Sequence, residues 1–146
     1  MTRYFTLQQA ERLLPDVERA IREAIDLKTE YQQAEIELRS EMQRVAMLGG
    51  VDLIRGAFAD LRTQRETSAD RLKAVIEAIH GIGCVVKDLD IGLIDFPTLF
   101  RGEEVYLCWK LGEREIAFWH GVDEGFRGRK AIDSEFLQNH QGELPN

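Results

Sequence analysis

The segment "GLIDFPTLFRGEEVYLCWKLGEREIAFWHG" (92–121) decides the fold, because apolar and polar residues alternate along it with the period of two of a β-strand. Three runs are separated by Arg101 and Gly102 and then by Gly112 and Glu113, and each pair places a glycine where a tight hairpin tolerates it. The sequence therefore predicts a three-stranded antiparallel β-meander.

The same alternation assigns the side chains to two faces of the predicted sheet. One face is apolar and is expected to pack on helices; it carries Ile94, Phe96, Thr98, Val105, Leu107, Trp109, Ile116, Phe118 and His120. The other face is mixed, and we expect it to contact a partner through Asp95, Tyr106, Cys108, Lys110 and Trp119. The pairing behind this assignment sets Trp109 opposite Ile116, so His120 and Cys108 fall on opposite faces.

Upstream of the strands, apolar residues recur with helical spacing in two long stretches. A capping box of Thr6 and Gln9 opens the first stretch. Pro15 then predicts either a separate short helix or a kinked first turn, followed by a long helix over 16–47. A Gly-Gly pair ends this helix, and a second helix, capped by Asp52, follows.

Each predicted helix has a polar middle, and folding the chain back between the helices places Glu35 opposite Arg65. The sequence thus predicts an α+β protein with a single domain. It comprises a long antiparallel two-helix hairpin (1–83), the β-meander with a Gly/Arg loop (84–130) and a polar tail (131–146). Because the apolar stripe along the hairpin is incomplete, we expect a second copy to cover it in a homodimer.

The composition is typical of a globular protein. The chain carries 26 acidic and 19 basic residues, and this excess of negative charge disfavours general nucleic-acid binding. No apolar run is long enough to span a membrane, and the N-terminus lacks the apolar core of a signal peptide, so we expect a cytoplasmic location without membrane association. The 2 cysteines form no CxxC pair, which predicts reduced thiols.

An acidic segment offers candidate metal ligands, namely Asp88, Asp90 and Asp95, together with His120. Carboxylate oxygens bind hard cations, but a calcium loop of the helix–loop–helix type needs more acidic positions than this segment has. The competing interpretation is a turn before a strand, in which Asp88 and Asp90 bond local backbone amides. The local turn is the favoured interpretation.

Cys108, His120 and Asp95 could also suggest a transition-metal site or a thiol nucleophile, but either is less well supported. Cys108 faces Asp95 in the predicted sheet, and a neighbouring carboxylate raises the pKa of a thiol, which lowers its reactivity. His120 is predicted on the opposite face and cannot activate the thiol. We therefore assign no catalytic residue and no cofactor, and we expect a protein without enzymatic activity.

The stretch "GFRGRK" (125–130) concentrates positive charge in an acidic protein. Arg127, Arg129 and Lys130 are candidates for binding a small anion or an acidic partner, because guanidinium groups bind carboxylates and phosphates in a bidentate fork. The alternative is that they pair with acidic residues of the same chain, such as Asp88, Asp90 or Asp123.

Three segments resemble a known family: "RYFTLQQAERLLP" (3–15), "GIGCVVKDLDIGLIDFP" (81–97) and "LCWKLGEREIAFWHGVDEGFRGR" (107–129) are similar to an uncharacterised bacterial family, domain of unknown function 2203. The resemblance implies a small cytoplasmic protein with no assigned activity. The leading interpretation is a non-enzymatic interaction or assembly module that contacts an unidentified protein partner through the hairpin and the mixed sheet face. The alternative is a protein that binds a small anion or a metal ion.

Overall fold

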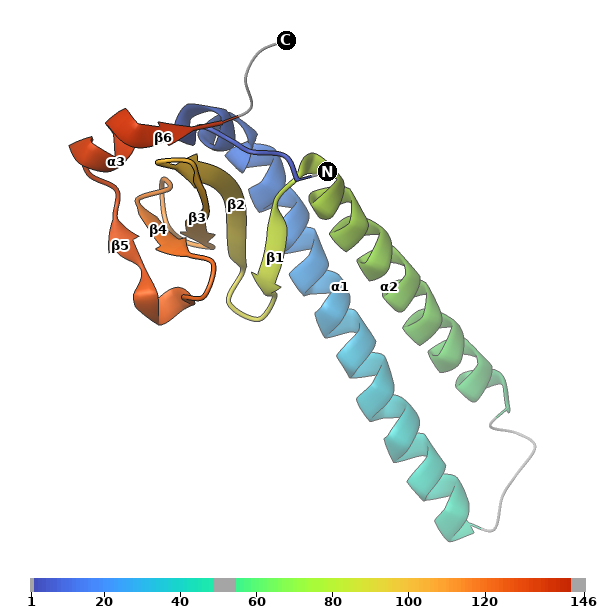
Figure 1. Cartoon of the computed structure of the whole chain (residues 1–146). Helices are drawn as coiled ribbons and strands as arrows, with labels where there is room; N and C mark the ends of the chain where they lie inside the picture. Colours follow the sequence, from blue (N-terminus) through green and yellow to red (C-terminus); the bar gives the residue numbers. More distant parts are fainter. Residues whose placement is uncertain (1, 49–54, 143–146) are drawn as a thin grey trace. The chain divides into compact units, whose positions relative to one another are not determined.

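The protein is described from a computed structural model, which covers residues 2–48 and 55–142 (Figure 1). In chain order the elements are α1 (Leu7–Leu48), α2 (Arg55–Ile82), β1 (Val85–Asp88), β2 (Leu93–Phe100), β3 (Glu103–Lys110), β4 (Phe118–Gly121), the 3-10 helix η2 (Phe126–Gly128), β5 (Lys130–Ala131), α3 (Ser134–Asn139) and β6 (His140–Gln141). The fold is α+β, as predicted. The predicted cap at Asp52 lies outside the described residues.

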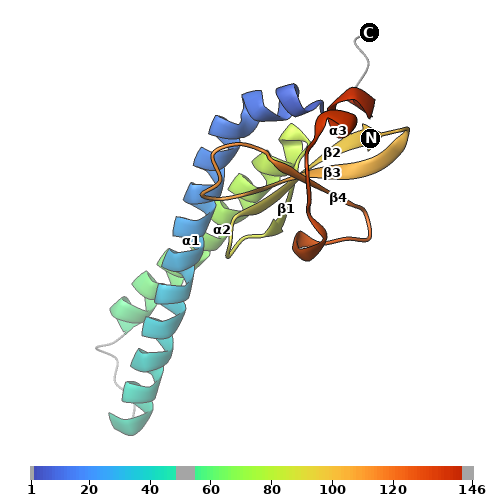
Figure 2. The same ribbon diagram turned by 90° about the vertical axis from the view of Figure 1, so that its left-hand side faces the viewer.

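The chain divides into two compact units. One unit contains the residues up to Arg22 and those from Ile76 onward, and the other is Glu23–Val75. In the first unit, the beginning of α1 and the end of α2 lie beside the sheet (Figure 2). Every residue that the sequence singles out for binding chemistry belongs to this unit.

The start of α1 is the predicted capping box. The amide of Gln9 donates to Thr6 Oγ1 at 3.1 Å, and the amide of Thr6 donates to Gln9 Oε1 at 2.9 Å. Two amide groups near the helix start are thereby satisfied reciprocally. Pro15 lies inside α1 without ending it, so a separate short helix before Pro15 is wrong.

The unit Glu23–Val75 contains the antiparallel helix pair. Arg65 Nη1 donates to Glu35 Oε1 at 2.8 Å, which confirms the predicted pairing of the two polar middles. Both side chains are half-buried, at 31% and 29% exposed. Alongside them, Ser68 Oγ donates to Glu30 Oε2 at 3.4 Å. The apolar side chains that α1 buries in this unit are Ala24, Leu27, Ala34 and Leu38.

The described strands form one sheet of six, in the order β1-β2-β3-β4-β5, with β6 pairing with β2 outside that path. The predicted hairpin between β2 and β3 is confirmed: Phe96 lies opposite Leu107, and the loop consists of Arg101 (φ 52°) and Gly102 (φ 82°). Two successive positive φ angles match the twist that a two-residue hairpin requires. The strands β1, β5 and β6 have 4, 2 and 2 residues, which is too short for a period of two to reveal them.

The connection between β3 and β4 is longer than predicted. Instead of a two-residue loop, residues 111–117 join the strands, and β4 begins only at Phe118. The amide of Glu113 donates to the carbonyl of Lys110 at 3.0 Å, which closes a turn directly after β3. The predicted pairing of Trp109 with Ile116 is therefore wrong, and the register of β4 moves by one residue.

This shift reverses the faces of β4, because side chains alternate with a period of two. His120 lies opposite Tyr106, on the same face as Cys108, and Trp119 lies opposite Leu107 on the apolar face. The predicted faces for His120 and Trp119 are thus exchanged. The observed register places His120 on the face that carries the carboxylate of Asp95 and the thiol of Cys108.

The apolar face of the sheet forms part of the hydrophobic core. Its fully buried side chains include Ile94, Phe96, Leu107 and Trp109. The ring of Phe5, which precedes α1, meets Phe96 edge-on at 5.5 Å. Within the predicted polar tail, Phe136 of α3 is 1% exposed and stacks on Trp119 at 4.9 Å between ring centroids. In the described part of the chain, none of the helices has an apolar stretch that would reach across a membrane.

Candidate functional site

Asp95, Cys108 and His120 come together on the sheet face opposite the apolar core. They lie on the adjacent strands β2, β3 and β4, and the register places all three on one face. A carboxylate oxygen, the thiol sulfur and an imidazole nitrogen lie within 4.8 Å of one another. The three residues are 1%, 0% and 2% exposed. Three different donor types are thus collected in a site from which bulk water is excluded.

Both nitrogens of the His120 ring face acceptor oxygens. Nδ1 lies 2.8 Å from the carbonyl oxygen of Gly121, and Nε2 lies 3.0 Å from both carboxylate oxygens of Asp95. A carbonyl oxygen only accepts, so Nδ1 carries a hydrogen. A second proton lies between Nε2 and the carboxylate, because without it two lone pairs would meet in a buried site.

The thiol of Cys108 is neutral near neutral pH. Its burial raises its pKa to about 12, and the negative charge of Asp95 adds to the rise, while Arg129 acts in the opposite direction. A neutral thiol is a poor nucleophile and a poor ligand. The direction agrees with the sequence prediction, and a bound cation would be needed to displace the proton.

Arg129 lies close enough to Cys108 for its charge to act on the thiol. Its guanidinium lies 4.0 Å from the ring centroid of Phe118 and 4.8 Å from that of Phe126. Its Nη2 donates to Glu113 Oε2 at 2.6 Å, and the side chain is only 8% exposed. Arg129 is therefore a buried, paired cation next to Cys108.

The predicted anion-binding residues do not act together. Arg129 pairs with Glu113, and Lys130 Nζ donates to Glu124 Oε1 at 2.5 Å. Arg127 is exposed. The alternative interpretation, pairing with the chain's own acidic residues, holds for two of these cations, although the partners are glutamates instead of the expected aspartates.

A cavity of about 120 Å³ lies against the cluster. Asp95 and His120 line it, and the segment 122–126 contributes Val122, Glu124, Gly125 and Phe126. The ring of Tyr106 also lines it, at 5.5 Å from the His120 ring, and Lys87 Nζ stands 5.2 Å from the Tyr106 ring centroid. The cluster is thus closed by the sheet on one side and borders a small, partly open cavity on the other.

Of the predicted metal ligands, the structure unites Asp95 and His120 and leaves the other two apart. The amide of Asp90 donates to Asp88 Oδ1 at 3.0 Å, and both residues are exposed. This bond is the local turn of the competing interpretation. Among the described residues, the donor group that could hold a metal ion consists of Asp95, His120 and Cys108. The sequence analysis had placed Cys108 on the opposite face from His120.

The predicted interaction surface is not one accessible surface. Asp95 and Cys108 are buried, and Trp119 lies on the other face of the sheet. Tyr106 and Lys110 remain partly exposed on the original face. The cause is again the register of β4.

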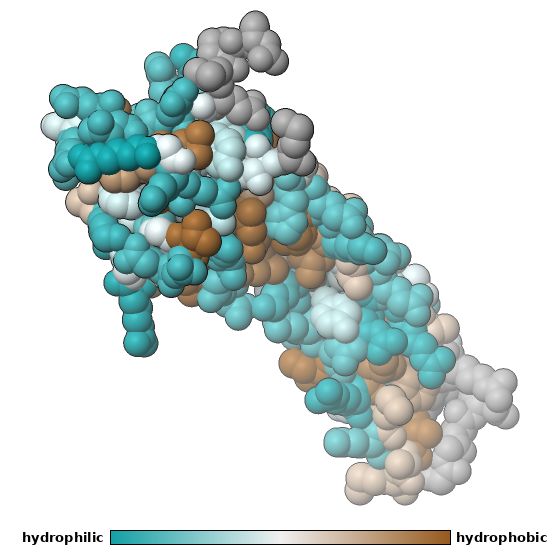
Figure 3. Space-filling view, in the orientation of Figure 1, coloured by the Kyte–Doolittle hydropathy of each residue, from teal (hydrophilic) through white to brown (hydrophobic). Residues whose placement is uncertain are grey.

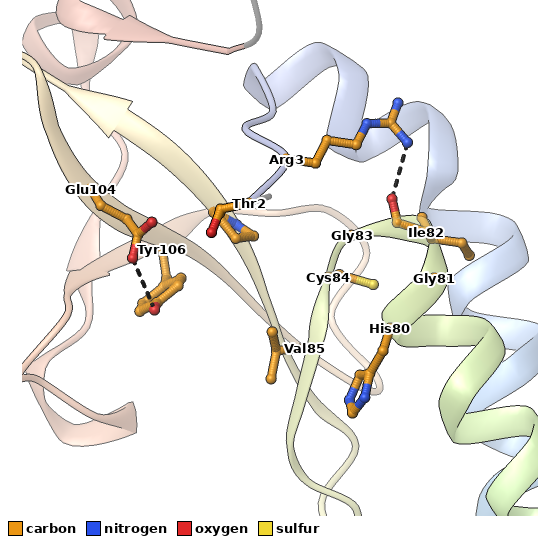
Figure 4. Close-up of a pocket in the computed structure, with 11 residues that line it drawn as sticks. Thr2, Arg3, His80, Gly81, Ile82, Gly83, Cys84, Val85, Glu104 and Tyr106 are labelled. Atoms are coloured by element: carbon orange, nitrogen blue, oxygen red, sulfur yellow. Dashed lines mark hydrogen bonds between the residues drawn. The ribbon is translucent and has the colours of Figure 1, made fainter.

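A larger cavity, of about 320 Å³, lies where the N-terminal segment meets the junction of α2 and β1 (Figure 4). In this pocket Tyr106 donates to Glu104 Oε2 at 3.4 Å, and Arg3 Nη1 donates to the carbonyl of Ile82 at 3.0 Å. Burial raises the pKa of Cys84, which also lines it, to about 11. Arg3 and Tyr106 are both paired within this pocket, and the described donor cluster that could hold a metal ion lies at the smaller cavity.

Residues 3–132 match a family described as "Uncharacterized conserved protein (DUF2203)". The chain belongs to this family. The matched region contains Asp95, Cys108 and His120. Comparison with the curated proteins and with the solved structures finds no match. The family description assigns no activity, so the chemistry of the site rests on its geometry.

Proposed function

We propose that the protein binds one divalent transition-metal ion, with Zn²⁺ as the best match, through Asp95, Cys108 and His120. The observation that supports this proposal is the convergence of three buried donors within 4.8 Å. Thiolate, imidazole and carboxylate together suit Zn²⁺, at distances of about 2.3 Å for sulfur and about 2.0–2.2 Å for nitrogen and oxygen. Hard cations such as Ca²⁺ and Mg²⁺ prefer oxygen ligands throughout.

Charge balance favours a divalent ion in this site. The thiolate of Cys108 and the carboxylate of Asp95 carry two negative charges, which a divalent cation neutralises. Without a metal, the same neutrality requires two protons, one on the thiol and one between Asp95 and His120. Metal binding therefore exchanges one M²⁺ for two H⁺, and the buried site is neutral in both states.

The hydrogen bond of His120 to the backbone orients its ring for coordination. Because Nδ1–H donates to the Gly121 carbonyl at 2.8 Å, the ring is held with Nε2 toward Asp95 and Cys108. Such a bond fixes the tautomer and leaves the other nitrogen for the metal. Loss of the proton at Nε2 exposes the lone pair that the metal needs.

The test is Co²⁺ binding to the purified protein and to two cysteine variants. Wild type is expected to bind one Co²⁺ per chain and to show thiolate-to-cobalt charge-transfer absorption. Cys108→Ala should lose this absorption, and Cys84→Ala should keep it, because both thiols are buried but only Cys108 belongs to the cluster. Circular dichroism checks that both variants fold. Retention of the absorption in Cys108→Ala, or its absence in wild type, would overturn the proposal.

Proton release gives a second, independent readout of the same site. Calorimetric titration of the metal in buffers of different ionisation enthalpy should report about two protons released per ion for wild type and about one for Cys108→Ala. The apparent affinity of wild type should accordingly rise more steeply with pH than that of Cys108→Ala. Binding to exposed carboxylates would release almost no protons.

An interaction module remains a second candidate, because large apolar side chains are exposed on α1. Ile36 and Met47 are 63% and 87% exposed and lie on one side of α1, because eleven residues are about three helical turns, and apolar colour reaches the surface of the helical unit (Figure 3). We propose a second copy of the chain as the occupant, since the same patch on both copies meets itself across a two-fold axis. Native mass spectrometry should then show a dimer that Ile36→Asp dissociates. A monomer at micromolar concentration would contradict this candidate.

A further inference from the structure

The three donors leave one position of a tetrahedral metal ion unfilled. Among the described residues, no fourth His, Cys, Asp or Glu belongs to the cluster. Glu124 lines the cavity, but its Oε1 accepts from the amide of Gly121 at 2.8 Å and from Lys130 Nζ at 2.5 Å. The described residues of the cluster thus supply three side-chain ligands, and a fourth ligand can come from outside the protein.

The cavity gives this fourth position a defined volume. Asp95 and His120 line the cavity and Cys108 does not, so a metal held by all three borders the cavity on the side of the first two. The cavity has a volume of about 120 Å³ and is partly open to solvent. This space admits a ligand as small as formate or acetate, and a larger acid has to extend out of it.

The charges around the cavity indicate which charge the fourth ligand should carry. The metal with its thiolate and carboxylate is neutral, and the carboxylate of Glu124 is paired with Lys130. Lys87 lines the cavity, and among the described residues no carboxylate pairs with it. The uncompensated charge beside the cavity is therefore positive, which favours a monoanion.

We propose that the metal site keeps its fourth position open toward this cavity, and that a small monocarboxylate or a similar monoanion binds there as an exogenous ligand opposite the charge of Lys87. This inference rests on the metal site proposed above. It adds a ligand class to the site: a monoanion as small as acetate, with one carboxylate oxygen on the metal and the other toward Lys87.

The test uses the Co²⁺-loaded protein titrated with formate, acetate and benzoate. The visible ligand-field bands of Co²⁺ report its coordination sphere. Formate and acetate are expected to shift these bands with saturation, and benzoate, whose ring needs more room than the cavity walls leave, is expected to bind more weakly. Lys87→Ala should weaken acetate binding about tenfold without changing Co²⁺ stoichiometry. Lys110→Ala is the matched control, because Lys110 lies on the same sheet face but does not line the cavity.

The outcomes separate this inference from the metal site itself. If Co²⁺ binds through Cys108 but the three acids leave its bands unchanged, the open position is wrong and the metal site stands. If benzoate binds as well as acetate, or if Lys87→Ala and Lys110→Ala behave alike, the cavity does not select the ligand and the inference fails. If Co²⁺ does not bind through Cys108, both proposals fail together.

Discussion

Both faces of the sheet bury side chains, but burial changes the free energy of folding in opposite directions on the two faces. On one face, Phe96 and Trp109 are fully buried, and removing their apolar surface from water stabilises the fold. On the other face, Asp95 and His120 are 1% and 2% exposed, and burying them costs free energy that their hydrogen bonds only offset. Burial alone therefore does not distinguish a hydrophobic core from a functional site, and the chemical identity of the buried groups is needed to tell them apart.

The largest effect is expected from truncation on the apolar face. Phe96→Ala removes a fully buried ring that contacts Phe5 and should lower the free energy of unfolding by about 3–5 kcal/mol. Urea unfolding measures this change. Provided that the variant still folds, its Co²⁺ stoichiometry should equal that of wild type, because Phe96 lies on the face away from the donors. A loss below about 1 kcal/mol would show that the apolar face does not dominate stability.

A smaller but coupled effect is expected on the polar face in metal-free protein. Asp95→Ala leaves His120 buried without its partner and should destabilise the fold by about 3 kcal/mol. The double variant Asp95→Ala/His120→Ala should cost clearly less than the sum of the two single changes, because no group is then left unpaired. Asp88→Ala, which changes an exposed aspartate, is the matched control and should stay within about 1 kcal/mol of wild type. Additive costs would show that the pair is not coupled.

The contrast between the faces also explains what the sequence could predict. Periodicity gave the fold class and the apolar residues of β2 and β3, because core burial imposes a regular pattern. The capping box of Thr6 and Gln9 and the pairing of Glu35 with Arg65 followed from local rules of helix chemistry. These features depend on residues whose spacing along the chain fixes their place in the fold.

The candidate site of Asp95, Cys108 and His120 was considered from the sequence and rejected, because it depends on a register that spacing does not fix. Counting a two-residue loop at Gly112 and Glu113 moved β4 by one residue and sent His120 to the wrong face. The polar run "GERE" (112–115) was the available signal, since it is longer than a tight hairpin loop needs. In the predicted register His120 lies on the face away from Cys108. In the observed register, which differs by one residue, it belongs to the three-donor cluster.

The smallest predicted effect compares Cys108 of the site with Cys84, which is also buried but outside the cluster. The pKa of each thiol is raised from 9.0, to about 12 for Cys108 and to about 11 for Cys84. Above pH 9 the unfolded chain loses thiol protons that the folded chain keeps, so the unfolded state binds fewer protons and stability falls as the pH rises. Each thiol contributes up to about 1.4 kcal/mol per pH unit. Urea unfolding between pH 8 and pH 10 should show this slope, and Cys108→Ala and Cys84→Ala should each remove part of it.

Metal loading should separate the two thiols. In the loaded protein Cys108 is already a thiolate in the folded state, so above pH 9 neither state carries its proton and its share of the slope disappears. The share of Cys84 is unaffected, because that thiol does not belong to the cluster. Wild type with Zn²⁺ should therefore show the shallower alkaline slope of metal-free Cys108→Ala. An unchanged slope would mean that the ion binds elsewhere and that the thiol of Cys108 is not a metal ligand.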